Sequence, residues 1–222
     1  MSTGSNSGDS SAAAATPQFL GTTLSSICAL LPRPLVMTGL FRDWMIRHFA
    51  DPAVIEDSSL RRLIWKPGQE TAILIESIHR WRPELTEKRP AVLVKRNAYS
   101  NLRVGVGDRR QGPPADGYGD PHYATYWVGS HTLFCLGGTG AEAELLSTEV
   151  QRELTEFGPL VARSVGLMRW QVLEIGQVQQ VEEATENFVV PVTVGYTYEQ
   201  RWVIHQQAPR LKRVSLSMLL EC

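Results

Sequence analysis

One stretch of the chain has residue types and spacing typical of a cofactor site. In "LFCLGGTGAEAELLSTEVQREL", residues 133–154, an apolar run ends in glycines and a helical pattern follows. Gly138, Gly140 and Ala143 have the G-x-G-x-x-A spacing of a dinucleotide-binding turn, whose glycines admit a pyrophosphate close to a helix N-terminus. Glu174, on a later strand-like run, would then imitate the acidic residue that binds the ribose. This stretch raises the hypothesis of a dinucleotide-binding enzyme.

The surrounding pattern argues against that hypothesis. The fingerprint belongs to a doubly wound parallel sheet, but the roughly 80 residues after the glycines hold two strand patterns and no further helix–strand units. No Lys-Ser or Lys-Thr follows the glycines, as a phosphate-binding loop requires. We therefore interpret them as a strand-to-helix turn, with Thr139 and Glu142 at capping-box spacing. We predict neither an enzyme nor a bound cofactor.

Histidines and cysteines form no recognisable catalytic or metal-binding pattern. The five histidines lack H-x-H and H-E-x-x-H spacing, and the close pair His122 and His131 has no evident third ligand. His48 continues an apolar helical stripe, which predicts a buried histidine with satisfied hydrogen bonds. Cys135 lies in an apolar strand-like run and is expected in the core. We predict no catalytic residue and no metal site.

Charge is distributed unevenly along the chain, although the formal net charge is only -1. The region from 79 to 110 is strongly basic, and its cationic residues form the basic block. These are Arg80, Arg82, Lys88, Arg89, Lys95, Arg96, Arg103, Arg109 and Arg110. The helical pattern that follows is acidic, through Glu142, Glu144, Glu149, Glu153 and Glu156.

Two interpretations of these charges remain open, beside a third for the basic block alone. In the first interpretation, each block is a solvated face of its own subunit. In the second, the basic surface of one copy binds the acidic surface of the next. Unlike surfaces that pair head to tail generate rings, and this interpretation expects the glutamates to face outward. Alternatively, the arginines of the basic block contact nucleic acid, although the chain lacks a recognised binding motif.

The composition is that of one globular domain with appended segments. Hydrophobic residues make up 43% and charged residues 20% of the 222 residues, which is ordinary for such a domain. No apolar run approaches the roughly 18 residues of a membrane helix. The Ser- and Ala-rich start cannot bury enough apolar surface to order itself. We predict a flexible arm at 1–18, one domain at 19–208 with a protruding loop at 103–121, and a C-terminal arm at 209–222.

Hydrophobic periodicity predicts an α+β fold. Helices are expected at 38–49, from Ser58 or Ser59, and at 139–157, and strands at 71–81, 91–97, 124–136, 168–178 and 187–204. The last strand alternates cleanly from Phe188 to Tyr198, and Pro191 predicts an edge or a bulge there. The helix at 139–157 has an apolar stripe from Ala143 to Phe157. The natural packing is a mostly antiparallel sheet with helices on one face.

The order of elements and several local phrases resemble the tail-terminator, or tail-completion, proteins of tailed bacteriophages. The resemblance covers about residues 36 to 205 and rests on "DWMIRHFADPAV", "RPAVLVKRN", "GSHTLFCLGGTGAEAELLSTEVQRELTEFGP", a strand ending near "EIG", and "ENFVVPVTVGYTYE". The two predicted arms and the 103–121 loop are additions to a compact terminator. They leave open whether the chain is the terminator itself or another neck ring.

The resemblance implies a structural virion protein at the head–tail neck, assembled in the host cytoplasm. It implies a ring, usually hexameric, that caps the tail tube, ends its polymerisation and joins it to the head. The implied partners are other copies of the chain, the tail tube protein, head-side connector or neck proteins, and the sheath protein in a contractile tail. Packaged DNA is a further contact for basic residues that line the lumen. A nucleic-acid-binding module and a dinucleotide-binding enzyme remain the alternatives.

Overall fold

The structure is a computed structural model that describes residues 18–19, 22–23, 34–68, 71–80, 90–102, 122–181 and 187–203. The predicted loop at 103–121 and the predicted C-terminal arm at 209–222 lie outside these residues. All of the predicted N-terminal arm except Gln18 lies outside them as well.

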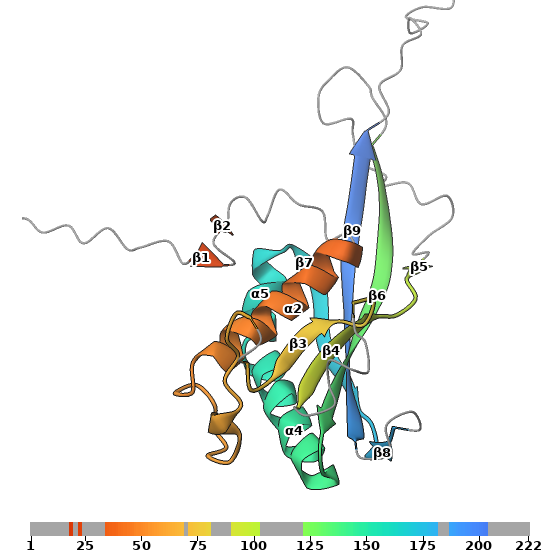
Figure 1. Cartoon of the computed structure of the whole chain (residues 1–222). Helices are drawn as coiled ribbons and strands as arrows, with labels where there is room; N and C mark the ends of the chain where they lie inside the picture. Colours follow the sequence, from red (N-terminus) through yellow and green to blue (C-terminus); the bar gives the residue numbers. More distant parts are fainter. Residues whose placement is uncertain are drawn as a thin grey trace, which may run out of the picture.

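The described residues form a seven-stranded sheet with helices gathered on one side of it (Figure 1), which confirms the predicted α+β fold. The helices are α2 (Pro34–Ala50), α4 (Gly140–Glu156), α5 (Gly158–Ser164) and the 3-10 turn η1 (Leu60–Arg62). The strands of the sheet are β3 (Leu74–Ser77), β4 (Ala91–Arg96), β5 (Ser100–Leu102), β6 (His122–Gly137), β7 (Leu167–Ile175), β8 (Gln179–Gln180) and β9 (Phe188–Val203). A separate short pair contains β1 (Gln18–Phe19) and β2 (Thr22–Thr23).

The main sheet has the strand order β3-β4-β6-β9-β7, with β5 on β6 and β8 on β9. Only β3 and β4 are parallel, so the sheet is mostly antiparallel as predicted. β6 and β9 pair over their whole length, from His122 opposite Val203 to Gly137 opposite Phe188. Because the other strands are shorter, one end of this β6–β9 ribbon extends beyond the helices (Figure 1).

Alternation along β9 places one face against the helices, as expected. Val190, Val192, Val194 and Tyr196 are almost completely buried in the main hydrophobic core. Pro191 lies where β7 ends: its carbonyl accepts from the Gly176 amide at 2.7 Å, just beyond an irregularity in the β7–β9 register. The N–H and C=O of a strand residue point to the same side, which for Pro191 is the side of β7. The N–H that proline lacks would therefore lie at the end of the β7–β9 hydrogen-bond ladder. β9 is an interior strand, so the predicted edge is wrong, and the nearest irregularity lies in β7, opposite Thr193 and Val194.

The core lies between the sheet and the two long helices. Phe41, Met45 and Phe49 of α2 are completely buried, and so are Leu146 and Leu154 of α4. Burying each such side chain stabilises the fold by about 1.5–3 kcal/mol. The helix at 38–49 begins earlier than predicted, at Pro34, because proline is well suited to the first helical position.

The predicted boundaries of α4 are confirmed, but its apolar stripe is shorter than predicted. Thr139 caps the helix by accepting from the Glu142 amide at 3.1 Å. The Glu142 carboxylate in turn accepts from the Gly138 amide at 3.0 Å, one residue earlier than in the usual capping box. Phe157 is 45% exposed. The helix ends at Glu156, before Phe157, and Gly158 starts a new helix in another direction.

Candidate assembly interface

The basic block is described at three of its nine positions, and the structure brings these three together. β3 and β4 are parallel, with Ser77 opposite Val94. Arg80, just after β3, and Lys95 and Arg96, the last residues of β4, therefore lie at the same end of the sheet. All three are exposed. The other six members, Arg82, Lys88, Arg89, Arg103, Arg109 and Arg110, lie outside the described residues.

The described basic residues have no carboxylate partner within the part of the chain that the structure describes. The Lys95 ammonium lies 5.8 Å from the centre of the Phe134 ring, on the sheet face away from α4. Arg96 pairs in register with His131 at the end of β4. Among the described residues, this end of the sheet therefore carries positive charge without an opposing carboxylate, which an acidic partner would complement.

The acidic helix differs from the expectation that its glutamates face outward. Glu149 and Glu153 are only 4% and 8% exposed, so the prediction of an outward orientation is wrong for these two. Their carboxylates hold α2 against α4: the ring of His48 lies 2.9 Å from Glu149 and 3.0 Å from Glu153. Trp44 donates to Glu153 at 2.7 Å. We call these four side chains the α2–α4 polar cluster.

The polar cluster is a buried network of polar contacts. Both ring nitrogens of His48 face a carboxyl group, so each has a hydrogen-bond partner. Burial acts to raise the pKa of Glu153, but hydrogen bonds from His48 and Trp44 outweigh it and the pKa is lowered overall. Arg152 adds a contact of 2.7 Å to Glu149. The prediction that His48 is a core histidine with satisfied hydrogen bonds is confirmed.

The three other glutamates of α4 lie at the surface, but two are occupied within the chain. Glu142 caps its own helix and contacts Arg62 at 2.9 Å. Glu156 contacts Arg152 at 3.0 Å, one turn earlier on the same helix. Only Glu144 is exposed without an ion pair among the described residues. The acidic surface available to a neighbour is therefore much smaller than the sequence predicted.

The strand-to-helix turn with its glycines, which we call the glycine elbow, lets β6 lead directly into α4. A Cβ at Gly137 would come within 2.7 Å of the Ala143 amide nitrogen, so the glycine allows α4 to start directly on the sheet. The N-terminus of α4, where a dinucleotide fingerprint places the pyrophosphate, is capped by Thr139 and Glu142. Both strands beside β6 run antiparallel to it. The elbow therefore lacks the parallel setting of a dinucleotide-binding turn.

His131 belongs to a buried hydrogen-bond chain. Thr38 donates to the Pro34 carbonyl, so its oxygen accepts from His131 Nε2, at 2.9 Å. His131 Nδ1 then accepts from the Tyr196 hydroxyl at 2.9 Å, and Tyr99 hydrogen-bonds to Tyr196. Burial, with a smaller effect from Arg96, lowers the pKa of His131 to about 4. The ring is thus neutral at pH 7 and links α2 to the sheet.

His122 and His131, the pair considered for a metal, lie nine residues apart on the same strand, β6. The ring of His131 is completely buried with both nitrogens satisfied, and the side chain of His122 lies outside the described residues. Among the described residues, no three His, Cys, Asp or Glu side chains gather as metal ligands. Cys135 is completely buried, and burial raises the pKa of its thiol.

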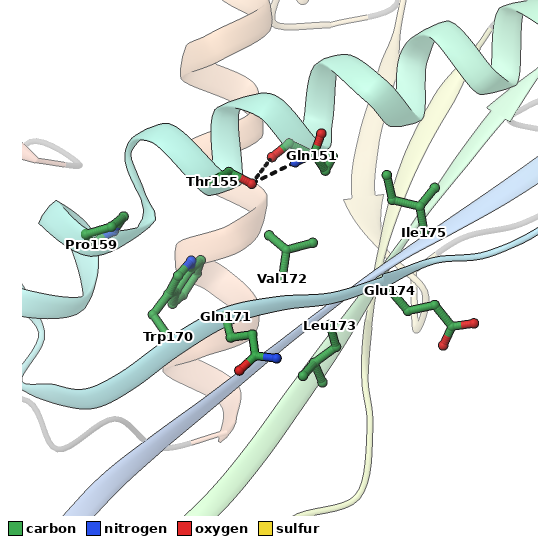
Figure 2. Close-up of a pocket in the computed structure, with 9 residues that line it drawn as sticks. All are labelled: Gln151, Thr155, Pro159, Trp170, Gln171, Val172, Leu173, Glu174 and Ile175. Carbon is green, nitrogen blue, oxygen red and sulfur yellow. Dashed lines mark hydrogen bonds between the residues drawn. The ribbon is translucent and has the colours of Figure 1, made fainter.

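The sequence did not reveal the apolar surface around β7. Met168, Leu173 and Ile175 are 59%, 52% and 46% exposed, and Leu160 of the neighbouring α5 is 61% exposed. These exposed apolar side chains lie along β7 and the helix that follows α4, with Leu173 and Ile175 on opposite sides of the strand (Figure 2). The strand was predicted, but its residues follow no strict alternation, so neither its place at an edge nor its exposed side could be deduced.

A groove of about 530 Å³ runs between this strand and the helices, and we call it the β7 groove. Its lining residues are Gln151, Thr155, Pro159, Trp170, Gln171, Val172, Leu173, Glu174 and Ile175. Val172 and Ile175 point toward α4, whereas Gln171 and Leu173 point to the other side of β7 (Figure 2). Glu174 is the only charged residue among the described residues of the lining.

No protein-family model matches the chain, and no curated protein matches it either. No helix of the described residues is both long enough and apolar enough to cross a membrane.

Proposed function

We propose that the protein is a structural virion component that forms a ring at the head–tail neck of a tailed bacteriophage. In this role it caps the tail tube, ends its polymerisation and joins it to the head connector. The proposal includes the partners and the virion localisation that the resemblance to tail-terminator proteins implies. The protein acts by binding and geometry, without turnover or a cofactor.

The observation that carries the proposal is the exposed apolar surface around β7. A subunit that works alone rarely leaves several large apolar side chains exposed on one edge strand and the adjoining helix. Leu160, Met168, Leu173 and Ile175 form such a set. The basic end of the sheet, at Arg80, Lys95 and Arg96, has no carboxylate partner among the described residues and supplies a second surface of different chemistry. Two unlike surfaces on one subunit suit head-to-tail contacts.

Negative-stain microscopy with native mass measurement tests this proposal. The protein is measured alone and after incubation with tail tubes, because terminators can stay monomeric until they meet a tube. We expect closed rings of defined mass, either free or at one end of each tube. A protein that remains monomeric and leaves the tube ends bare would contradict the proposal.

Two further titrations separate the alternatives. Saturable binding of NAD by a monomer would favour the dinucleotide-binding enzyme. Binding to DNA that weakens steeply with salt, without any ring, would favour the nucleic-acid-binding module.

A further inference from the structure

β7 presents an open edge for strand addition. It pairs with β9 on one side, and no described residue pairs with its other side. Its pairing with β9 is regular from Arg169 to Val172 and irregular on both sides of this stretch. An open edge strand offers unpaired backbone donors and acceptors to another chain. Bulges discourage indiscriminate pairing, so a partner strand must gain further affinity from its side chains.

The β7 groove sets the chemistry of those side chains. An added strand places alternate residues on opposite faces of the sheet, about 7 Å apart along each face. Residues on the α4 side enter the groove beside Val172 and Ile175. Residues on the other side lie beside Gln171 and Leu173. The fitting partner is therefore a short strand with apolar residues at every second position and small polar residues between them.

The chain itself contains such a segment. In "RVSLSMLL", residues 213–220, Val214, Leu216, Met218 and Leu220 alternate with Ser215, Ser217 and Leu219, so Leu219 is the one apolar residue between them. We propose that the 213–220 segment of one copy adds to the edge of β7 in a second copy, with its apolar face in the β7 groove. The inference rests on the proposed ring, because it supplies the contact between neighbouring subunits. Lys212, just before the segment, and Arg213, its first residue, complement Glu174, the one charged residue among the described residues of the groove.

Geometry favours a second copy over the same chain. Antiparallel addition continues the pattern of β6, β9 and β7 and is the more stable pairing. In this direction the segment begins opposite Ile175. Ile175 is level with Val192 of β9, about 36 Å along the strand from Val203 at 3.3 Å per residue. The chain from Val203 to Arg213 spans at most about 36 Å without any turn. It would also have to cross β7 and reverse direction twice, which leaves too little chain.

Hydrogen exchange with a synthetic peptide tests the contact directly. The probe is a peptide of residues 209–221 added to a chain that ends at Ala208, so that the domain is retained. We expect the outward amides of 167–175 to exchange about tenfold more slowly when the peptide is present at about ten times its Kd. A peptide with Leu216→Asp should lose this protection, because it brings a charge into the groove. The matched control Ser217→Asp carries the same charge on the other face and should retain protection.

Absence of protection at millimolar peptide, or equal loss with both variants, would overturn the inference. The full chain supplies the second test, by native mass and exchange at two concentrations. We expect the protection of β7 to rise with concentration and Leu216→Asp to prevent assembly. Protection in a monomer at every concentration would place the segment on its own chain and overturn the commitment to a second copy. Rings that persist without residues 209–222 would overturn the inference and leave the proposed function intact. Peptide binding without any ring would support the inference and contradict the proposed function.

Discussion

The substitution Glu153→Gln tests whether the α2–α4 polar cluster stabilises the fold. It removes the charge that faces His48 at 3.0 Å and weakens the hydrogen bond from Trp44 at 2.7 Å. Leaving a buried donor without its partner costs about 1–3 kcal/mol, and more where a charged group is involved. Glutamine keeps an acceptor for the indole, so we expect about 3 kcal/mol. For a chain of this size, the melting temperature should fall by roughly 6–12 °C.

The control is Glu156→Gln, the same change one turn further along α4. Glu156 is exposed and contacts Arg152 on the same helix, so its loss should cost no more than about 0.5 kcal/mol. Both variants are compared by urea denaturation at one low protein concentration, because assembly would shift apparent stability. Equal effects of the two changes would refute the argument.

The pH dependence of the Glu153→Gln effect adds an independent check. The folded pKa of Glu153 is lowered from its ordinary value of 4.5. Its contribution is therefore present above pH 4.5 and lost as the pH falls through the folded value. The difference between the wild type and Glu153→Gln should shrink in acid.

Three further predictions concern the core and the caps. The pKa of His131 is lowered from 6.5 to about 4, so the unfolded chain takes up a proton before the folded one as the pH falls through this window. Stability should drop there by roughly 3 kcal/mol, and His131→Gln should flatten this slope in urea titrations at several pH values. A Cβ at Gly158 would lie 2.0 Å from Trp170 Nε1, whereas one at Gly39 meets nothing within 4 Å. Gly158→Ala should therefore destabilise by about 1–3 kcal/mol and Gly39→Ala stabilise by about 0.5–1 kcal/mol, as measured by thermal unfolding. Thr139→Ala, which removes the cap of α4, should cost about 1 kcal/mol in the same assay.

Local patterns in the sequence predicted most of the fold. The alternation in β9 and the stripe from Ala143 to Leu154 each identify a buried face, because burial of one face imposes a period of 2 or 3.6 residues. The cap at Thr139 was predictable since capping depends on residues only three apart. Strand order was not predictable in this way. The parallel pairing of β3 with β4, for example, joins segments whose contact depends on the whole topology.

The burial of Glu149 and Glu153 shows why the candidate site was harder to predict than the fold. Both residues flank the apolar stripe of α4, and a glutamate at such a position is usually solvated. Here α2 covers that flank and brings His48 and Trp44 to the carboxylates from about a hundred residues away in sequence. Periodicity describes one helix at a time and contains no information on the partner that covers it. The same limit hid the exposed side of β7, which depends on what does not pack there.

The choice between a closed pair and a larger ring depends on whether the two partners in the contact are alike. If the β7 edges of two copies paired with each other, the contact would be isologous and the assembly would end at two subunits. A donor segment at 213–220 and an acceptor at β7 are different parts of the chain, so each copy donates once and accepts once. Such a heterologous contact closes into a ring when the rotation between subunits closes, and otherwise continues as a filament. Register is strongly specified where one face of a strand is buried. The apolar face of the segment in the β7 groove therefore favours one rotation between subunits and one closed ring of defined size.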